Sequence, residues 1–154
     1  MQRKQMKVKY SAHKRHSNSG DNYDERPLLH VRLRNGANII DVDGLVDSGA
    51  TDCVFTHDLA DALDIDLTDS PMKEYEAIGG SVIQAYKHNV KLQVVGFDEW
   101  ITINAGFINH DEMPILGHSG FFDSYAITFR SYNHQFEITR KKAKTRPHPR
   151  TLRK

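Results

Sequence analysis

Short extended segments separated by glycine and asparagine turns are the feature that most limits how this chain can fold. Apolar and polar side chains alternate over residues 27–33, and Asn35-Gly36 follows as a turn signal. Similar stretches lie at residues 39–46, 73–78, 81–95, 100–103, 125–129 and 135–139. One helix is predicted from Thr56 to Leu63, and a second short one within residues 118–123. The pattern therefore predicts a mostly β domain with one or two short helices.

Charge divides the chain into three parts. Residues 1–16 hold six Lys or Arg and no acid, residues 140–154 hold eight and no acid, and the segment between them carries a net charge of −13. We therefore predict a flexible basic and polar N-terminal tail and linker at 1–26, one folded domain at 27–139 and a basic C-terminal tail at 140–154. The tails are expected mainly to solubilise an acidic body, and a weak contact with a polyanion is the alternative.

The remaining bulk features concern the compartment. No apolar run approaches the roughly 20 residues that a membrane-spanning helix needs, and the N-terminus lacks the apolar stretch of a secretory signal. Cys53 is the single cysteine, so no disulfide can form within the chain. We expect a cytoplasmic protein with no membrane partner.

The segment Leu45-Val46-Asp47-Ser48-Gly49-Ala50 carries the chemical information. Two apolar residues run into the core, and an aspartate follows at the end of the strand. Carboxylates are seldom placed there without a function. Ser48 can hydrogen-bond within a tight loop, and Gly49 permits close approach of the backbone. An ordinary strand-to-turn exit remains the alternative interpretation, since Asp and Gly are common in turns.

This segment resembles the Asp-Ser/Thr-Gly motif of the retropepsin-like (retroviral-type) aspartic peptidases. Two further elements follow in the order of that family: the hairpin tip 77–81, Ala-Ile-Gly-Gly-Ser, is similar to its glycine-tipped flap, and Pro114-Ile115-Leu116-Gly117 with Phe121-Phe122 is similar to the segment before its C-terminal helix. The resemblance implies a closed β-barrel-like acid-protease fold with a flap hairpin, a homodimer, and hydrolysis of extended peptide segments. No cofactor and no metal is expected.

A single copy of the motif implies that two subunits are needed. Aspartic peptidase chemistry uses two carboxylates that share one proton and activate a water molecule. Asp43-Gly44 lacks the intervening hydroxyl residue, and Asp123-Ser124 is followed by Tyr125, so only Asp47 fits. The second catalytic carboxylate is therefore expected from Asp47 of another subunit across a two-fold axis.

By resemblance, Ser48 and Gly49 support the catalytic loop. The substrate is expected to contact Gly49, Ala50, Thr51, Asp52, Ile78, Gly79 and Gly80. Ala50 lacks the hydroxyl that pepsin-like enzymes have there, so activity is expected at mildly acidic to near-neutral pH. Many viral members have an Asp–Arg ion pair where Thr51 and His118 stand, so the dimer is expected to depend more on other contacts.

Other chemistries have weaker support. The histidines lack companions for a metal site, and Cys53, four residues before His57, is expected to pack in the core rather than act as a nucleophile. Two alternative functions stay open: a catalytically silent, self-associating peptide-binding module of the same fold, and a nucleic-acid-associated protein that uses its basic tails.

Overall fold

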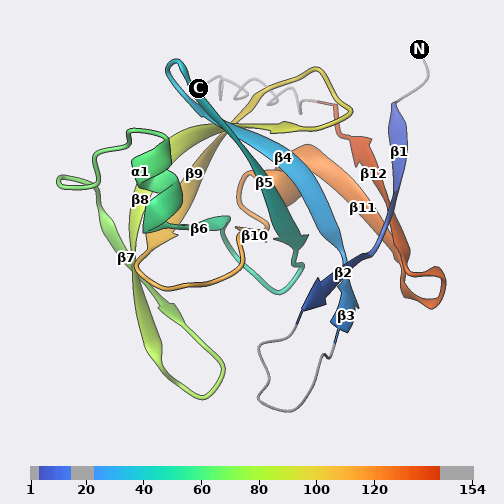
Figure 1. Cartoon of the computed structure of the whole chain (residues 1–154), viewed down its shortest axis with the longest axis horizontal. Helices are drawn as coiled ribbons and strands as arrows, with labels where there is room; N and C mark the ends of the chain where they lie inside the picture. Colours follow the sequence, from blue (N-terminus) through green and yellow to red (C-terminus); the bar gives the residue numbers. More distant parts are fainter. Residues whose placement is uncertain (1–3, 15–22, 143–154) are drawn as a thin grey trace, which may run out of the picture.

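The computed structural model describes residues 4–14 and 23–142, and its main element is a seven-stranded sheet, whose curved ribbon Figure 1 shows. The strand order is β4-β5-β10-β6-β9-β8-β7, and β4 also pairs with β8. A sheet whose first strand also pairs with its sixth must curve back on itself. The strands are β4 (Leu28–Asn35), β5 (Asn38–Val46), β6 (Val54–Thr56), β7 (Met72–Glu76), β8 (Val82–Val94), β9 (Ile101–Ile108) and β10 (Ile115–Leu116). The mostly β prediction is confirmed.

Alternation along the strands builds the core. In β4, Leu29, Val31 and Leu33 are each at most 1% exposed, whereas the residues between them face outward. The turn from β4 to β5 pairs Asn35 with Asn38, and Gly36 takes a left-handed φ of 58° that favours glycine. Core side chains from the other strands complete the apolar interior, among them Phe55, Leu92, Ile103, Phe107 and Leu116.

A second sheet joins the two ends of the described chain. It has the order β1-β12-β11, from β1 (Gln5–Lys9), β11 (Tyr125–Arg130) and β12 (Gln135–Arg140). The predicted flexible tail over residues 1–26 differs from the structure here, because Met6 and Val8 pack against the core while the intervening lysine stays exposed. Two apolar residues among lysines were too weak a pattern to predict a strand. The segment forms one because β12 supplies the partner for its backbone hydrogen bonds.

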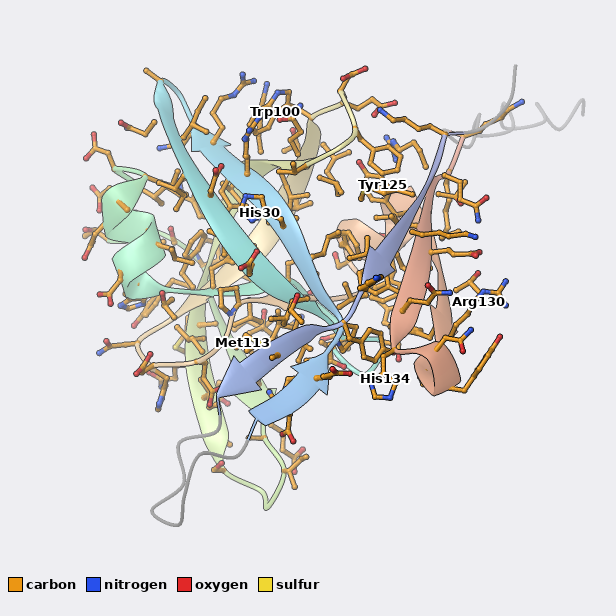
Figure 2. The ribbon with its side chains drawn as sticks, turned by 45° about the vertical axis from the view of Figure 1, so that its right-hand side comes forward. His30, Trp100, Met113, Tyr125, Arg130 and His134 are labelled. Carbon is orange, nitrogen blue, oxygen red and sulfur yellow. The ribbon has the colours of Figure 1, made fainter. Side chains whose placement is uncertain are left out.

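The rest of the predicted N-terminal tail also contains strands. β2 (Ser11–Lys14) and β3 (Tyr23–Arg26) pair in antiparallel fashion. His134, in the turn before β12, contacts Glu25 of β3, so this hairpin lies beside the end of the second sheet (Figure 2). Most of the C-terminal tail predicted at 140–154 lies outside the described residues, so the proposed polyanion contact stays a prediction.

The helices are short. α1 (His57–Ala62) confirms the helix predicted after Thr56, although the Thr56 hydroxyl makes no capping hydrogen bond. α2 (Phe121–Ser124) overlaps the second predicted helix and ends one residue beyond it, and η1 (Ser131–Asn133) is a single 3-10 turn between β11 and β12. Among the described residues, no helix has the length and apolar character required to cross a membrane.

Candidate active site

Asp47 stands directly after the buried end of β5. Val46 is 3% exposed, and Asp47 itself is half-buried. The short strand β10 lies between β5 and β6 and runs parallel to β5, with Leu116 opposite Val46. The backbone N–H of Asp47 donates to the carbonyl of Leu116 at 3.1 Å. The backbone of Asp47 is therefore held both by β5, which it follows, and by β10.

The loop after Asp47 orients its carboxylate. The backbone N–H of Gly49 donates to Oδ1 of Asp47 at 2.8 Å, and the N–H of Ala50 donates to the Asp47 carbonyl at 3.3 Å. A Cβ on Gly49 would lie 3.2 Å from Oδ1, which is tighter than ordinary contact. Ser48 and Gly49 are exposed in the isolated chain. The loop therefore presents an oriented carboxylate beside an uncovered surface.

The segment after β10 supports this loop from the side. The N–H groups of His118 and Ser119 donate to the carbonyls of Ala50 at 2.9 Å and Thr51 at 2.8 Å. A Cβ on Gly117 would lie 2.2 Å from the Asp52 carbonyl oxygen, so only glycine fits there. The loop that follows Asp47 and the end of the Ile115-Leu116-Gly117 segment are thus in contact.

His118 makes a contact that the sequence did not reveal. Its Nε2 lies 2.6 Å from the Ser48 carbonyl, and its ring stacks on Phe122 with centroids 4.9 Å apart. A carbonyl can only accept, so Nε2 carries the proton in this arrangement. His118 therefore braces the Asp47 loop by donating to the Ser48 carbonyl.

Asp52 takes a different place from the one expected for a residue that contacts substrate. Its side chain is 7% exposed, and its Oδ2 accepts from Lys73 Nζ at 2.7 Å, Tyr75 Oη at 2.7 Å and Lys87 Nζ at 3.0 Å. Burial raises the pKa of the Asp52 carboxyl, but the hydrogen bonds from these three residues outweigh it and lower the pKa to about 2. Burial and the same hydrogen bond raise the pKa of Tyr75.

The three residues that hold Asp52 come from the stem of the flap hairpin. Lys73 and Tyr75 lie on β7, and Lys87 lies on β8 and also donates to the Asn104 carbonyl at 2.8 Å. The sequence prediction missed all three. Strands were predicted at all three positions. Nothing in the sequence, however, indicated that this face of the hairpin contacts Asp52.

The flap itself closes at residues 77–81. Ala77 N–H donates to the Ser81 carbonyl at 2.8 Å, and Gly79 and Gly80 have φ values of 94° and 81°, which favour glycine. Ile78 at the tip is fully exposed, and Val82 is 58% exposed. The predicted glycine-tipped hairpin is therefore present, with apolar side chains that nothing in the isolated chain covers.

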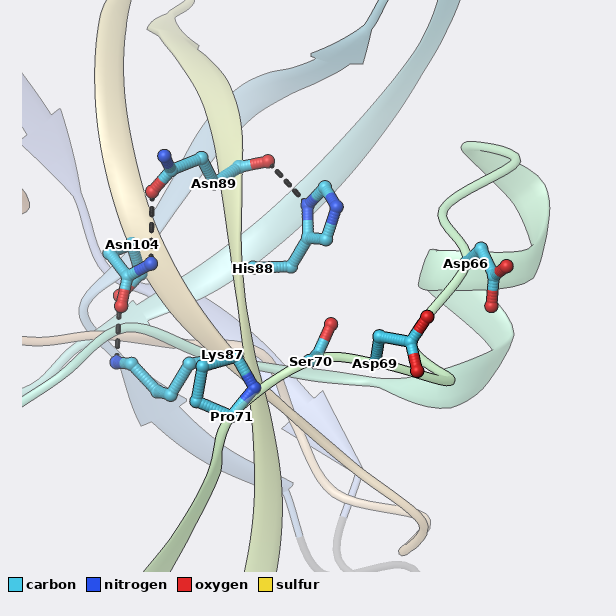
Figure 3. Close-up of a pocket in the computed structure, with 8 residues that line it drawn as sticks. All are labelled: Asp66, Asp69, Ser70, Pro71, Lys87, His88, Asn89 and Asn104. Carbon is cyan, nitrogen blue, oxygen red and sulfur yellow. Dashed lines mark hydrogen bonds between the residues drawn. The ribbon is translucent and has the colours of Figure 1, made fainter.

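A polar pocket lies beside β8 and β9, next to the flap stem (Figure 3). It has a volume of about 430 Å³ and is lined by Asp66, Asp69, Ser70, Pro71, Lys87, His88, Asn89 and Asn104. Within the described part of the chain this lining does not include the Asp47 loop.

Cys53, next to Asp52, is fully buried, and burial raises the pKa of its thiol to about 11. It packs in the core and is no activated nucleophile.

Comparison with known proteins agrees with this geometry. A family model described as aspartyl protease matches residues 30–118. A retropepsin-like aspartic protease from Rickettsia conorii has a similar fold, with a TM-score of 0.61 and 17% identity over 87% of this chain and 98% of that chain. EIAV protease in complex with the inhibitor HBY-793 gives a TM-score of 0.50 and 20% identity over 62% of this chain and 84% of that chain. No curated protein sequence matches.

The matched region runs from His30 within β4 to His118, and so contains the Asp47 loop, the flap and the β10 segment that supports the loop. The similar structures show a retropepsin-like fold, as the sequence motifs indicated. The chain belongs to the aspartyl protease family.

Proposed function

We propose that this protein is an aspartic endopeptidase that works as a homodimer, with Asp47 of each subunit supplying one of two catalytic carboxylates. The observation that carries the proposal is the placement of Asp47. It follows a buried strand, its carboxylate is oriented by the Gly49 N–H, and the loop beside it is exposed. A second copy of the same loop, brought up across a two-fold axis, supplies the missing acid.

The chemistry follows from the pairing. Two carboxylates about 3 Å apart cannot both be ionised, so the pair holds one proton. The ionised member takes a proton from a water molecule, whose oxygen attacks the scissile carbonyl carbon, while the protonated member donates a hydrogen bond to the carbonyl oxygen. The tetrahedral intermediate then breaks at the C–N bond as the leaving nitrogen receives a proton from the pair.

The exposed surfaces support an extended peptide as substrate and a second subunit as partner. Ser48 and Gly49 are exposed in the single subunit, as expected for a loop that packs against the same loop of a second subunit. Ile78 and Val82 expose apolar surface at the flap, which closure over a substrate removes from water. Gly49 and the flap residues Gly79 and Gly80 offer backbone groups to an added strand.

The experiment that tests the proposal uses tandem single-chain dimers, in which two copies are joined by a flexible linker. Three forms are compared: two wild-type copies, one wild-type copy with one Asp47→Asn copy, and two Asp47→Asn copies. Each is incubated with a peptide library, and cleavage is followed by mass spectrometry. We expect the two mutant forms to lose at least about 100-fold in activity, because each dimer has a single shared site.

Half-activity in the mixed form would contradict the shared site, because it would mean that each copy works alone. Cleavage by all three forms would assign the activity to another residue or to a contaminant. A wild-type dimer that forms in sedimentation analysis and cleaves nothing would overturn the peptidase proposal and favour the silent peptide-binding module.

A further inference from the structure

The inner face of the flap stem carries positive charge. Residues directly opposite each other in an antiparallel pair share a face, so Lys73 and Ala85 lie on one side of the hairpin, as do Tyr75 and Ile83. Lys87, two residues after Ala85, is on the same side. This is the side that contacts Asp52, in the wall that follows the catalytic loop. Both lysines therefore lie on the side of the flap stem that faces the segment after the Asp47 loop.

The charges at this point do not cancel. Within the hydrogen-bonded cluster two lysines share the single carboxylate of Asp52, so one of the two ammonium charges is not matched by a carboxylate of the cluster. Lys87 is 13% exposed and also binds the Asn104 carbonyl, so it is committed to the protein. The Lys73 side chain is 45% exposed, and Asp52 engages one of its three N–H donors. Lys73 is therefore the group from which the surplus charge can reach a ligand.

The distance to the reaction centre is limited by the chain itself. Asp52 lies five residues after Asp47, which spans at most about 17 Å even when fully extended. The hydrogen bonds of the loop make the true distance shorter. A bound peptide strand advances by about 3.3 Å per residue, so Lys73 lies within roughly six substrate residues of the scissile bond.

Building on the proposed peptidase function, we infer that Lys73 is a specificity-determining residue that favours substrates with Asp or Glu at one position within about six residues of the scissile bond. The Lys73 ammonium can give a substrate carboxylate a charge-assisted hydrogen bond, and it repels a basic side chain at the same place. Asp52 acts as a positioning residue. It holds the Lys73 ammonium in place by accepting its hydrogen bond, and its own carboxylate is buried and so does not face the substrate.

Direct contact of Asp52 with the substrate would have the opposite effect on specificity. A carboxylate exposed to the substrate would favour Lys or Arg at this position. Because three donors converge on Oδ2 of Asp52 and the side chain is 7% exposed, the ammonium and not the carboxylate is presented. The sign of the charge preference therefore distinguishes the two possibilities.

The first test is library digestion by the wild type, Lys73→Met, Lys73→Glu and the control Lys91→Met, which removes an exposed lysine further along β8. In the wild type and the control we expect about three- to tenfold enrichment of Asp and Glu at one position. Lys73→Met should abolish the enrichment, and Lys73→Glu should shift it toward Lys and Arg. Enrichment that survives Lys73→Met, or a basic preference in the wild type, would overturn the inference while leaving the peptidase function intact.

A second test does not depend on catalysis. Asp47→Asn protein, with and without Lys73→Met, is titrated with two fluorescent peptides that differ only by Glu against Gln at each position in turn. We expect one position where Glu binds about three- to tenfold more tightly, and loss of that difference with Lys73→Met. Equal affinities for all pairs in the Lys73 protein would refute the inference even if no substrate is ever cleaved.

Discussion

Replacement of Asp52 by asparagine should destabilise the fold strongly, because its buried carboxylate accepts hydrogen bonds from three side chains. The mutation leaves two ammonium groups and the Tyr75 hydroxyl beside a neutral amide, at a side chain that is 7% exposed. Breaking a buried ion pair costs about 3–5 kcal/mol, and the 45% exposure of Lys73 reduces this by allowing it to turn to water. We expect a loss of about 2–3 kcal/mol at pH 7.

The pH dependence gives an independent measure of the same interaction. The pKa of Asp52 falls from 3.8 in the unfolded chain to about 2 in the folded protein. A lowered folded pKa adds stability that is fully present above the unfolded value and is lost as the pH falls toward the folded one. The difference is worth about 2 kcal/mol at pH 7, and about half of it should be gone at pH 3.

Urea unfolding, followed by the fluorescence of the single tryptophan Trp100, measures both effects. Wild type, Asp52→Asn and the control Asp111→Asn, at an exposed position, should be compared at pH 7, 4 and 3 and at one protein concentration, since association shifts apparent stability. Asp111→Asn should change the free energy of unfolding by less than about 0.5 kcal/mol. The reasoning is wrong if Asp52→Asn matches this control at pH 7, or if its effect does not shrink on acidification.

Three further predictions concern the loop, the pH optimum and the second sheet. Gly117→Ala should lower the free energy of unfolding by more than about 3 kcal/mol, because its Cβ would lie 2.2 Å from the Asp52 carbonyl oxygen; thermal unfolding measures this, and a loss below 1 kcal/mol would contradict it. Ala50→Ser should move the pH of maximal peptide cleavage toward acid by offering the Asp47 pair another hydrogen bond to its charged form, and an unchanged pH–rate profile would count against that reasoning. Deleting residues 1–10, which contain β1, should cost about 2 kcal/mol through lost apolar packing, whereas an unchanged melting temperature would show that β1 contributes nothing.

Local sequence patterns predicted most of the fold and the floor of the site. The alternation in β4, the glycine turn of the flap and the apolar approach to Asp47 are all short-range signals, and the structure has strands and turns at each of them. The helix after Thr56 was likewise visible in its spacing. These features depend on neighbours in sequence, so they can be read without knowing the fold.

Features that depend on distant residues escaped prediction. The cluster around Asp52 joins residues 21 and 35 positions away, and the contact of His118 with Ser48 joins residues 70 apart. The strand β1 was missed because its partner, β12, lies at the other end of the domain. In each case one local pattern fits several partners, and only the folded chain shows which one is used.

The pairing of β1 with β12 has a consequence for the order in which the molecule can form. Gln5 meets Thr139, so a loop of more than 130 residues has to close before this ladder exists. Contacts so far apart in sequence slow folding, because ordering the intervening chain precedes any gain from the contact. On the ribosome, Met6 and Val8 must therefore wait, without their final cover, until nearly the whole domain has been synthesised, and the second sheet should be among the last parts of the protein to become protected from hydrogen exchange.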